Sequence, residues 1–357
     1  MGEMWRLIDS GLRSPAQNIA LDRALLEARA ADEIPSTLRF SRFAPCVLIG
    51  CSQSPAQEVD LEYCAAADLV VQRRLSSGDA VYCDSAQLAW SLYLHRLDLG
   101  AADMQSIARR IGHAAATALN ATGIAACFRA LHDLETDGRT IGTGGGVTEG
   151  DAILYQGMLN VELDFGAVLS ATRTPALGLG DHAMSAARSR MTDLKSALGK
   201  TVDAGILREC LIAAFENEFS AELHDADLSL TEHARYRNAL AEIDTPDWIN
   251  LVSAPAADIQ VAAAKQPRVS GAMNVTMLYD RSRRRIKQVW FTTDSGLLPS
   301  SGITGLEAVL RDTSVERLER NVHAFFAAGH ELQSLKASEI ISLLRRVLQL
   351  PLVVPHP

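Results

Sequence analysis

Residues 72–84 read QRRLSSGDAVYCD. An apolar run at 69–71 precedes two arginines, Arg73 and Arg74, and a second apolar run at 80–82 follows a short turn of serine, glycine and aspartate. The two runs predict strands that anchor the turn at both ends. A turn held in this way can present backbone N–H groups and guanidinium groups to an anion. The stretch therefore predicts an anion-binding loop between two strands.

The overall composition is that of a folded, acidic protein. The chain has 357 residues, of which 48% are apolar and 22% are charged, and its formal net charge is −9. This length is sufficient for two domains with a sizeable core. The acidic balance argues against non-specific binding to nucleic acid, which requires a basic surface. No apolar run reaches the roughly 18 to 20 residues of a membrane span, so we expect no membrane association.

The N-terminus and the cysteines indicate a cytoplasmic protein. The N-terminal sequence MGEMWRLIDSGLRSP contains no apolar segment of the kind found in export signals. The six cysteines are scattered, with no C-x-x-C pair and no histidine at metal-site spacing. We therefore expect reduced thiols, no metal site and a cytoplasmic location.

Helical and strand patterns together predict an α+β domain. Ser14 and Pro15 form an N-cap and first-turn pair for a helix over 15–31, and a second apolar stripe predicts a helix over 103–121. The Asp-Gly dipeptide at 137–138 predicts a type I′ hairpin turn. Short strands outnumber helices and are joined largely by hairpins, which favours an α+β sheet over a doubly wound one.

The glycine-rich segment GTGGG, residues 142–146, directly follows this hairpin. Consecutive glycines there can form either a nest of backbone N–H groups for a phosphate or a flexible exit from the hairpin. A long strand is expected at 153–164, and the polar, glycine-bearing segment 178–195 predicts a mobile loop.

A change in composition predicts the domain boundary. Residues 253–271 are rich in Ala, Pro and small polar residues. We expect a first domain over 1–253, a linker over 254–271 and a C-terminal accessory domain over 272–357. The accessory domain begins with two strands around the basic turn 280–285, which is either a solvated hairpin or a docking surface for an acidic carrier protein.

The loop at 73–84 resembles the signature of the lipoate–protein ligase family, Arg-Arg-x-Ser-Gly-Gly-Gly-Ala-Val-Tyr-His-Asp. Eight of its eleven specified positions match: Arg73, Arg74, Ser76, Gly78, Ala80, Val81, Tyr82 and Asp84. Ser77, Asp79 and Cys83 stand where the family has Gly, Gly and His. A second segment is similar to the family's adenylate-closing loop, at Ser185, Arg188, Ser189, Arg190, Thr192 and Leu194.

The resemblance implies the biotin/lipoate ligase-like fold, with a small α+β accessory domain. It also implies a lipoate–protein ligase that uses ATP with Mg²⁺ to activate lipoate or octanoate as the adenylate. The acyl group then passes to a lysine of a lipoyl-domain or other carrier protein. The residues it places around the adenylate are Arg73, Arg74, Ser76, Ser77, Gly78, Asp79, Ala80, Cys83, Asp84, Gly142, Gln156, Gly157, Ser185, Arg188 and Arg190.

One position carries the family's chemistry in a different residue type. The family's Gly-Arg-Lys-Ile-Ser-Gly string supplies a lysine that contacts the acyl carbonyl and the phosphate, and here Thr140 takes its place. A hydroxyl can donate a hydrogen bond but brings no charge. Asp79 adds a carboxylate, which at about 4 Å from a phosphate oxygen costs roughly 1 kcal/mol in water and about 4 kcal/mol at an effective dielectric of 20.

Two alternatives to the ligase follow from these differences. Cys127 lies in an Ala-Cys-Phe string similar to the place where related octanoyltransferases keep a nucleophilic cysteine, so it can form an acyl-enzyme without ATP. The other alternative is a paralogue that binds a lipoyl group or a partner without chemistry, which Thr140 and Asp79 together favour.

Overall fold

The computed structural model divides into two compact units. The first comprises Met1–Asp164 and Thr192–Ser253, and the second Phe165–Met191 and Ala254–Pro357. The residues that the structure describes are 3–100, 102–129, 133–254, 258–266, 273–293, 301–329, 332 and 336–349.

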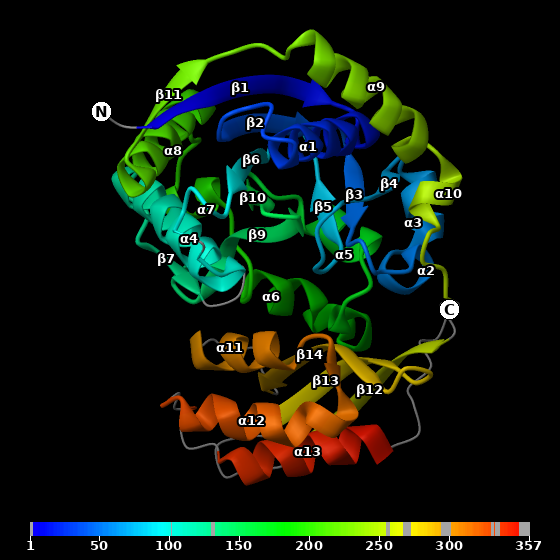
Figure 1. The fold of residues 1–357 in the computed structure, drawn as a ribbon. Helices are drawn as coiled ribbons and strands as arrows, with labels where there is room; N and C mark the ends of the chain where they lie inside the picture. The colour runs from blue at the N-terminus through cyan, green and yellow to red at the C-terminus, as the bar shows by residue number, and fades with distance from the viewer. Residues whose placement is uncertain are drawn as a thin grey trace. The chain divides into compact units, whose positions relative to one another are not determined.

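The first unit is built on an eight-stranded mixed sheet in the order β11-β1-β2-β6-β10-β9-β8-β7 (Figure 1). Its strands are β1 (Glu3–Arg13), β2 (Thr37–Phe43), β6 (Leu88–His95), β7 (Ala126–Arg129), β8 (Asp133–Thr136), β9 (Arg139–Glu149), β10 (Ala152–Leu159) and β11 (Ala221–Asp225). The strands from β2 to β7 pair antiparallel, and β1 pairs parallel with both neighbours. The α+β prediction is therefore confirmed.

A smaller sheet in the order β4-β3-β5 carries the loop that the sequence singled out. Its strands are β3 (Cys46–Ile49), β4 (Val70–Arg73) and β5 (Val81–Cys83). The predicted pair of strands flanking the arginine loop is thus present. We call residues 73–79 the arginine loop.

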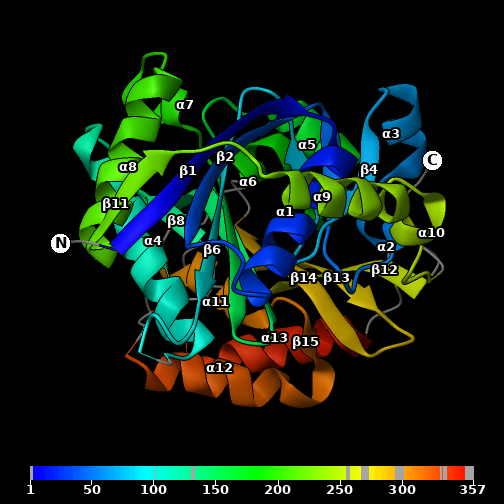
Figure 2. The same ribbon diagram turned by 45° about the horizontal axis from the view of Figure 1, so that its top comes forward.

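Helices cover both faces of the large sheet. α1 packs on one face with α9 alongside it, and α4 and α8 pack together on the other face (Figure 2). The helices of this unit are α1 (Pro15–Ala30), α2 (Pro55–Glu58), α3 (Leu61–Ala66), α4 (Met104–Ala121), α7 (Leu194–Leu198), α8 (Ala204–Phe219), α9 (Leu230–Ile243) and α10 (Pro246–Ile249). Within the described parts of the chain, no helix is both long enough and apolar enough to cross a membrane.

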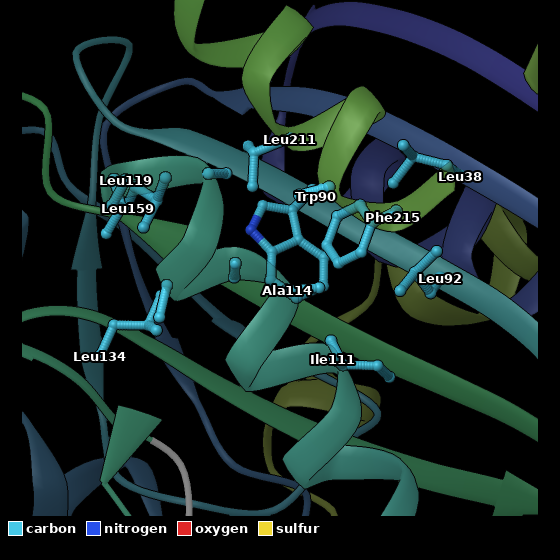
Figure 3. Packing of buried hydrophobic residues seen from close by; sticks show 14 of the residues in the cluster. Leu38, Trp90, Leu92, Ile111, Ala114, Leu119, Leu134, Leu159, Leu211 and Phe215 are labelled. Atoms are coloured by element: carbon cyan, nitrogen blue, oxygen red, sulfur yellow. The ribbon is translucent and has the colours of Figure 1, made fainter. Parts of the chain in front are cut away.

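The core between the sheet and the α4–α8 pair is centred on Trp90. The indole ring of Trp90 is 2% exposed and lies 5.1 Å from the ring of Phe215, measured between centroids (Figure 3). Gly157 on β10 makes room for it, because a Cβ there would lie 2.1 Å from the indole. This contact fixes Gly157 by packing, so the adenylate contact predicted for it has no support in the geometry.

The predicted hairpin at 137–138 is confirmed, but the glycine-rich segment after it is not a nest. Asp137 and Gly138 have φ values of 49° and 73°, as a type I′ turn requires. The whole GTGGG segment belongs to β9 and pairs in regular register with β10. Its backbone groups are therefore committed to the sheet. A Cβ at Gly142 would lie 2.8 Å from the Met158 carbonyl oxygen, so β9 depends on glycine at this position.

The second unit has its own sheet and its own core. The sheet runs β12-β13-β14-β15, with strands β12 (Ile259–Gln266), β13 (Met273–Asp280), β14 (Arg285–Thr293) and β15 (Thr313–Ser314). Three longer helices pack on it: α11 (Ser301–Leu310), α12 (Leu318–Ala327) and α13 (Ala337–Gln349). Shorter helices come from the inserted segment: α5 (Phe165–Ala171), η1 (Pro175–Gly178), η2 (Gly180–His182) and α6 (Ala183–Arg188).

Two sequence-based expectations are corrected in this unit. The span 254–271, expected to be a linker, contains β12. The small residues of this strand were interpreted as a linker composition. The basic turn is paired with acidic side chains of the same unit: Arg284 with Glu316, and Arg285 with Asp312. Because these charges are already compensated, the docking idea receives no support from them.

Candidate functional site

The arginine loop is closed by its own arginine. The Arg74 guanidinium donates to the carbonyl oxygens of Leu48 and Ser77, each at 3.0 Å. Burial lowers the pKa of Arg74, and the nearby Asp79 carboxylate raises it. Gly78 has a φ of 109°, a conformation that L side chains rarely adopt, so the turn depends on this glycine. The hydrogen bonds of Arg74 thus hold the turn closed, and the Asp79 carboxylate offsets the charge of Arg74.

Arg73 does not present its charge to a ligand. Its side chain is 1% exposed, and its guanidinium donates to five backbone carbonyl oxygens at 2.6–3.3 Å. The carbonyls belong to Gly50, Cys51, Trp248, Ile249 and Val252. The Trp248 indole N–H donates back to the Arg73 carbonyl at 3.0 Å. Arg73 therefore ties the end of the first unit to the loop, and this geometry does not support the predicted phosphate contact.

A chain of hydrogen bonds links the arginine loop to the interior. The Ser76 hydroxyl donates to Gln156 Oε1 at 2.9 Å, and Gln156 Nε2 donates to Asp22 Oδ2 at 2.7 Å. Because a carboxylate only accepts, Asp22 fixes the orientation of the amide, and the amide oxygen is turned toward Ser76. We call this the Ser76–Gln156–Asp22 chain. It brings two predicted site residues, Ser76 and Gln156, together.

Asp22 is fully buried on α1. Its Oδ1 accepts from the Tyr93 hydroxyl at 2.5 Å and the Ser91 hydroxyl at 3.2 Å, and Arg39 Nη2 lies 3.2 Å away. Burial raises the pKa of Asp22, while Arg39 and the hydrogen bonds act to lower it. A buried carboxylate with this many partners costs free energy to disturb, because each partner left unpaired would stay out of water.

One face of the large sheet carries the remaining candidate residues. Side chains alternate along a strand, and Leu134 and Gly142 face α4. Their neighbours in the register face the other way, on what we call the site face, the face of β7–β10 opposite α4. A Cβ at Gly145 on this face would lie 3.6 Å from the Ser77 carbonyl oxygen. The arginine loop therefore lies against the site face.

Cys127, Glu135 and Thr140 form a row across the site face. In the antiparallel register Cys127 on β7 lies opposite Glu135 on β8, and Glu135 lies opposite Thr140 on β9. Directly opposed residues on neighbouring strands have Cβ atoms about 4.5–5.5 Å apart. The two predicted catalytic residues are thus separated by one strand, and the residue between them is a glutamate.

The environment of Cys127 does not activate its thiol by charge. Cys127 is exposed and carries no disulfide. Partial burial and the Glu135 carboxylate raise its pKa, and Arg129 acts in the opposite direction. The thiol is therefore mainly protonated at neutral pH.

The other loop residues have structural surroundings. Cys83 is fully buried against Met158, with 3.5 Å between the sulfur atoms, so it packs rather than meets a ligand. Asp84 Oδ1 accepts from the Ala86 N–H at 2.7 Å, which closes the turn after β5. Ala80 is half-buried at the start of that strand, and Gly142 packs against Leu134 and Leu159.

The predicted closing loop belongs to the second unit. Arg190 pairs with Glu307 at 2.6 Å, donates to the Phe291 carbonyl at 2.7 Å and lies over the Trp290 ring. Arg188 is exposed and lies over the ring of Phe165, and Ser185 is exposed on α6. Arg190 is therefore held inside its own unit, and a ligand role for Ser185 and Arg188 remains a prediction.

The described residues of the first unit do not fit the triphosphate of ATP. The guanidinium groups of Arg73 and Arg74 donate hydrogen bonds to backbone carbonyl oxygens. Thr140 brings no charge, and Asp79 adds a carboxylate to the loop. The GTGGG backbone is paired in β9. Nothing in this arrangement supplies the concentrated positive charge that phosphoryl chemistry requires.

Sequence reasoning missed the buried partners of the site. Asp22 and Arg39 are each flanked by apolar residues, Leu21 beside Asp22 and Leu38 and Phe40 beside Arg39, and they form a buried pair. Glu135 also gave a signal, because its alternation with Leu134 in the predicted hairpin puts it on the face opposite the core.

Comparisons with known proteins find relatives that are similar in sequence. The octanoyltransferase LipM of Moorella thermoacetica is 26% identical over 270 residues, covering 69% of this chain and 98% of that protein. LipM of Clostridioides difficile is 25% identical over 247 residues, covering 63% and 90%.

Solved structures show the same fold. The bipartite lipoate protein ligase of Thermoplasma acidophilum superposes with a TM-score of 0.61 at 22% identity, covering 71% of this chain and 98% of that one. LipL1 of P. falciparum, solved with lipoate, superposes with a TM-score of 0.56 at 14% identity, covering 96% and 99%. The lipoyl protein ligase A/B catalytic-domain model matches residues 14–216, and the chain belongs to this family.

Proposed function

We propose that this protein is an ATP-independent acyltransferase that moves an octanoyl-class acyl group through a thioester on Cys127. The donor is an acyl carrier protein thioester, and the acceptor is a lysine of a lipoyl domain. Neither ATP nor Mg²⁺ is required, because the acyl group arrives already activated. This proposal replaces the AMP-forming ligase as the leading hypothesis.

The observation that carries it is the row on the site face. Cys127 is an exposed thiol one strand away from Thr140, the position at which the ligase family has its lysine. The arginines that a ligase would direct at a phosphate are occupied elsewhere. The relatives named octanoyltransferase, which this chain covers almost end to end, support the same choice.

The test is acyl-enzyme formation followed by intact-protein mass spectrometry. Incubation with octanoyl carrier protein should add one octanoyl group to the wild type and to Cys51→Ala, but none to Cys127→Ala. Cys51 is the matched control because it is the other exposed cysteine. ATP–pyrophosphate exchange with lipoate or octanoate should be absent. Exchange activity together with an unacylated Cys127 would reject the proposal in favour of the ligase.

A further inference from the structure

We propose that Glu135 is the proton acceptor for Cys127. This inference rests on the proposed acyl transfer and assigns a role to a residue that is neither the nucleophile nor at the lysine position. It addresses a specific difficulty of the site, which is that Cys127 needs to lose a proton and has no lysine or histidine in its row.

The register places the two groups side by side. Cys127 and Glu135 are directly opposed on β7 and β8, and both side chains project from the site face. The Glu135 side chain is 6% exposed, so its carboxylate is held near the sheet rather than in bulk solvent. Thr140, opposite Glu135 on the far side, has no titratable proton that competes for this role.

The charges around Glu135 make it a usable base. Arg129 on β7 pairs with Glu135, and also with Asp133 at 2.8 Å. Burial raises the pKa of Glu135 above its usual value, Asp133 raises it further, and Arg129 acts against both. A carboxylate with a raised pKa accepts a proton more readily than a solvated one. Oε1 of Glu135 is the oxygen that pairs with Arg129, so this ion pair fixes one end of the carboxylate.

The reaction balances with this single base. Cys127 Sγ bonds to the carbonyl carbon of the donor thioester while its proton passes to Glu135. The carbon–sulfur bond to the carrier then breaks, and the carrier thiolate takes the proton from Glu135. In the second half, the neutral amine of the acceptor lysine attacks the Cys127 thioester. Glu135 removes the amine proton and returns it to the Cys127 thiolate, which restores the enzyme.

The experiment compares two rates in Glu135→Gln that the inference predicts will change in opposite directions. Acylation of Cys127 by octanoyl carrier protein, measured under single-turnover conditions, should slow by about 100-fold or more, because the base is lost. Alkylation of Cys127 by iodoacetamide at pH 7.5 should become faster by about threefold to tenfold, because removal of a neighbouring carboxylate stabilises the thiolate.

Asp151→Asn is the matched control. It also removes a carboxylate that pairs with an arginine, Arg96 at 2.6 Å, but Asp151 lies in the turn between β9 and β10, outside the row. Its acylation rate should stay within about threefold of wild type. Glu135→Asp should retain part of the acylation rate, and melting curves of all variants verify that each is folded. A folded Glu135→Gln protein that acylates at the wild-type rate would overturn the role of Glu135 alone, whereas a wild type that never acylates would overturn the proposed function and this inference with it.

Discussion

Replacement of Gln156 by leucine tests whether the Ser76–Gln156–Asp22 chain stabilises the arginine loop. The substitution keeps the side-chain volume roughly constant but removes both hydrogen bonds of the amide. It leaves the Ser76 hydroxyl, which is 2% exposed, and one oxygen of the fully buried Asp22 without their partners. An unpaired buried hydroxyl costs about 1–3 kcal/mol, and a lost bond to a carboxylate costs about 1.5–3 kcal/mol. We therefore expect a destabilisation of about 3–5 kcal/mol.

Urea unfolding followed by tryptophan fluorescence measures this cost. Of the four tryptophans, Trp290 lies in the second unit, so a Trp290→Phe background leaves reporters only in the first. For a slope of about 2–3 kcal/mol/M, the midpoint should fall by about 1–2.5 M urea. Gln156→His is the matched variant, because imidazole can donate to Asp22 and accept from Ser76. It should cost less than about 1.5 kcal/mol.

A double-mutant cycle with Ser76→Ala separates the chain from simple packing. If the hydrogen bond between Ser76 and Gln156 is formed, the two losses should overlap, with a coupling free energy of about 1–2 kcal/mol. Additive costs, within about 0.5 kcal/mol, would show that the two side chains do not interact. A Gln156→Leu variant as stable as wild type would refute the reasoning altogether.

Three further predictions concern other parts of the first unit. Gly157→Ala should lower the free energy of unfolding by about 3 kcal/mol or more, because the new Cβ would lie 2.1 Å from the Trp90 indole. Gly145→Ala is the control, because its Cβ would have no neighbour nearer than 3.6 Å, and in the same urea assay its free energy of unfolding should stay within about 1 kcal/mol of wild type. Burial raises the pKa of Glu232, but hydrogen bonds donated by Arg6 and the Ser229 N–H lower it by more, so the pKa in the folded protein lies below its usual value. The ionised Glu232 therefore stabilises the fold above its unfolded pKa, and this stabilisation is lost as the pH falls through the lowered folded pKa. Glu232→Gln should therefore cost about 1–3 kcal/mol at pH 7, with the difference from wild type shrinking below pH 4.5; a difference that does not depend on pH would contradict this. Thr140→Lys should speed acylation of Cys127 about tenfold by favouring the thiolate, and an unchanged single-turnover rate would count against the row as the reacting site.

Local patterns predicted most of the helices and strands of the first unit. The helix predicted over 15–31 is present as Pro15–Ala30 with Ser14 as its N-cap, and the helix predicted over 103–121 is present as Met104–Ala121. The residues that predict these elements, the N-cap and the apolar periodicity, lie within the elements themselves or directly beside them. β1 was not predicted, because its burial depends on β2 and β11, and β11 lies more than 200 residues further along the chain. The glycine run was assigned to a loop because glycine has low intrinsic strand propensity, which packing against β10 and α4 overrides.

The site was predictable in its members but not in their roles. Motif matching selected Arg73, Ser76 and Gln156 together, and the last two do meet. The use of Arg73 depends on carbonyls 175–179 residues away, which no local pattern encodes. Cys127 and Thr140 were identified separately, and their shared row depends on the register of three strands. Long-range pairing decides which charged groups remain free, and that information lies outside any single stretch.

The hydrogen bonds from Arg73 to five backbone carbonyls affect the order in which the first unit folds during synthesis. The guanidinium receives three of its five carbonyl partners from Trp248, Ile249 and Val252, at the end of the first unit. While a ribosome is still translating residues 74–247, the Arg73 guanidinium lacks those acceptors and cannot be buried without leaving donors unpaired. The strand leading into the arginine loop therefore reaches its final conformation only after residue 252 has left the exit tunnel, which makes the candidate site one of the last parts of this unit to mature.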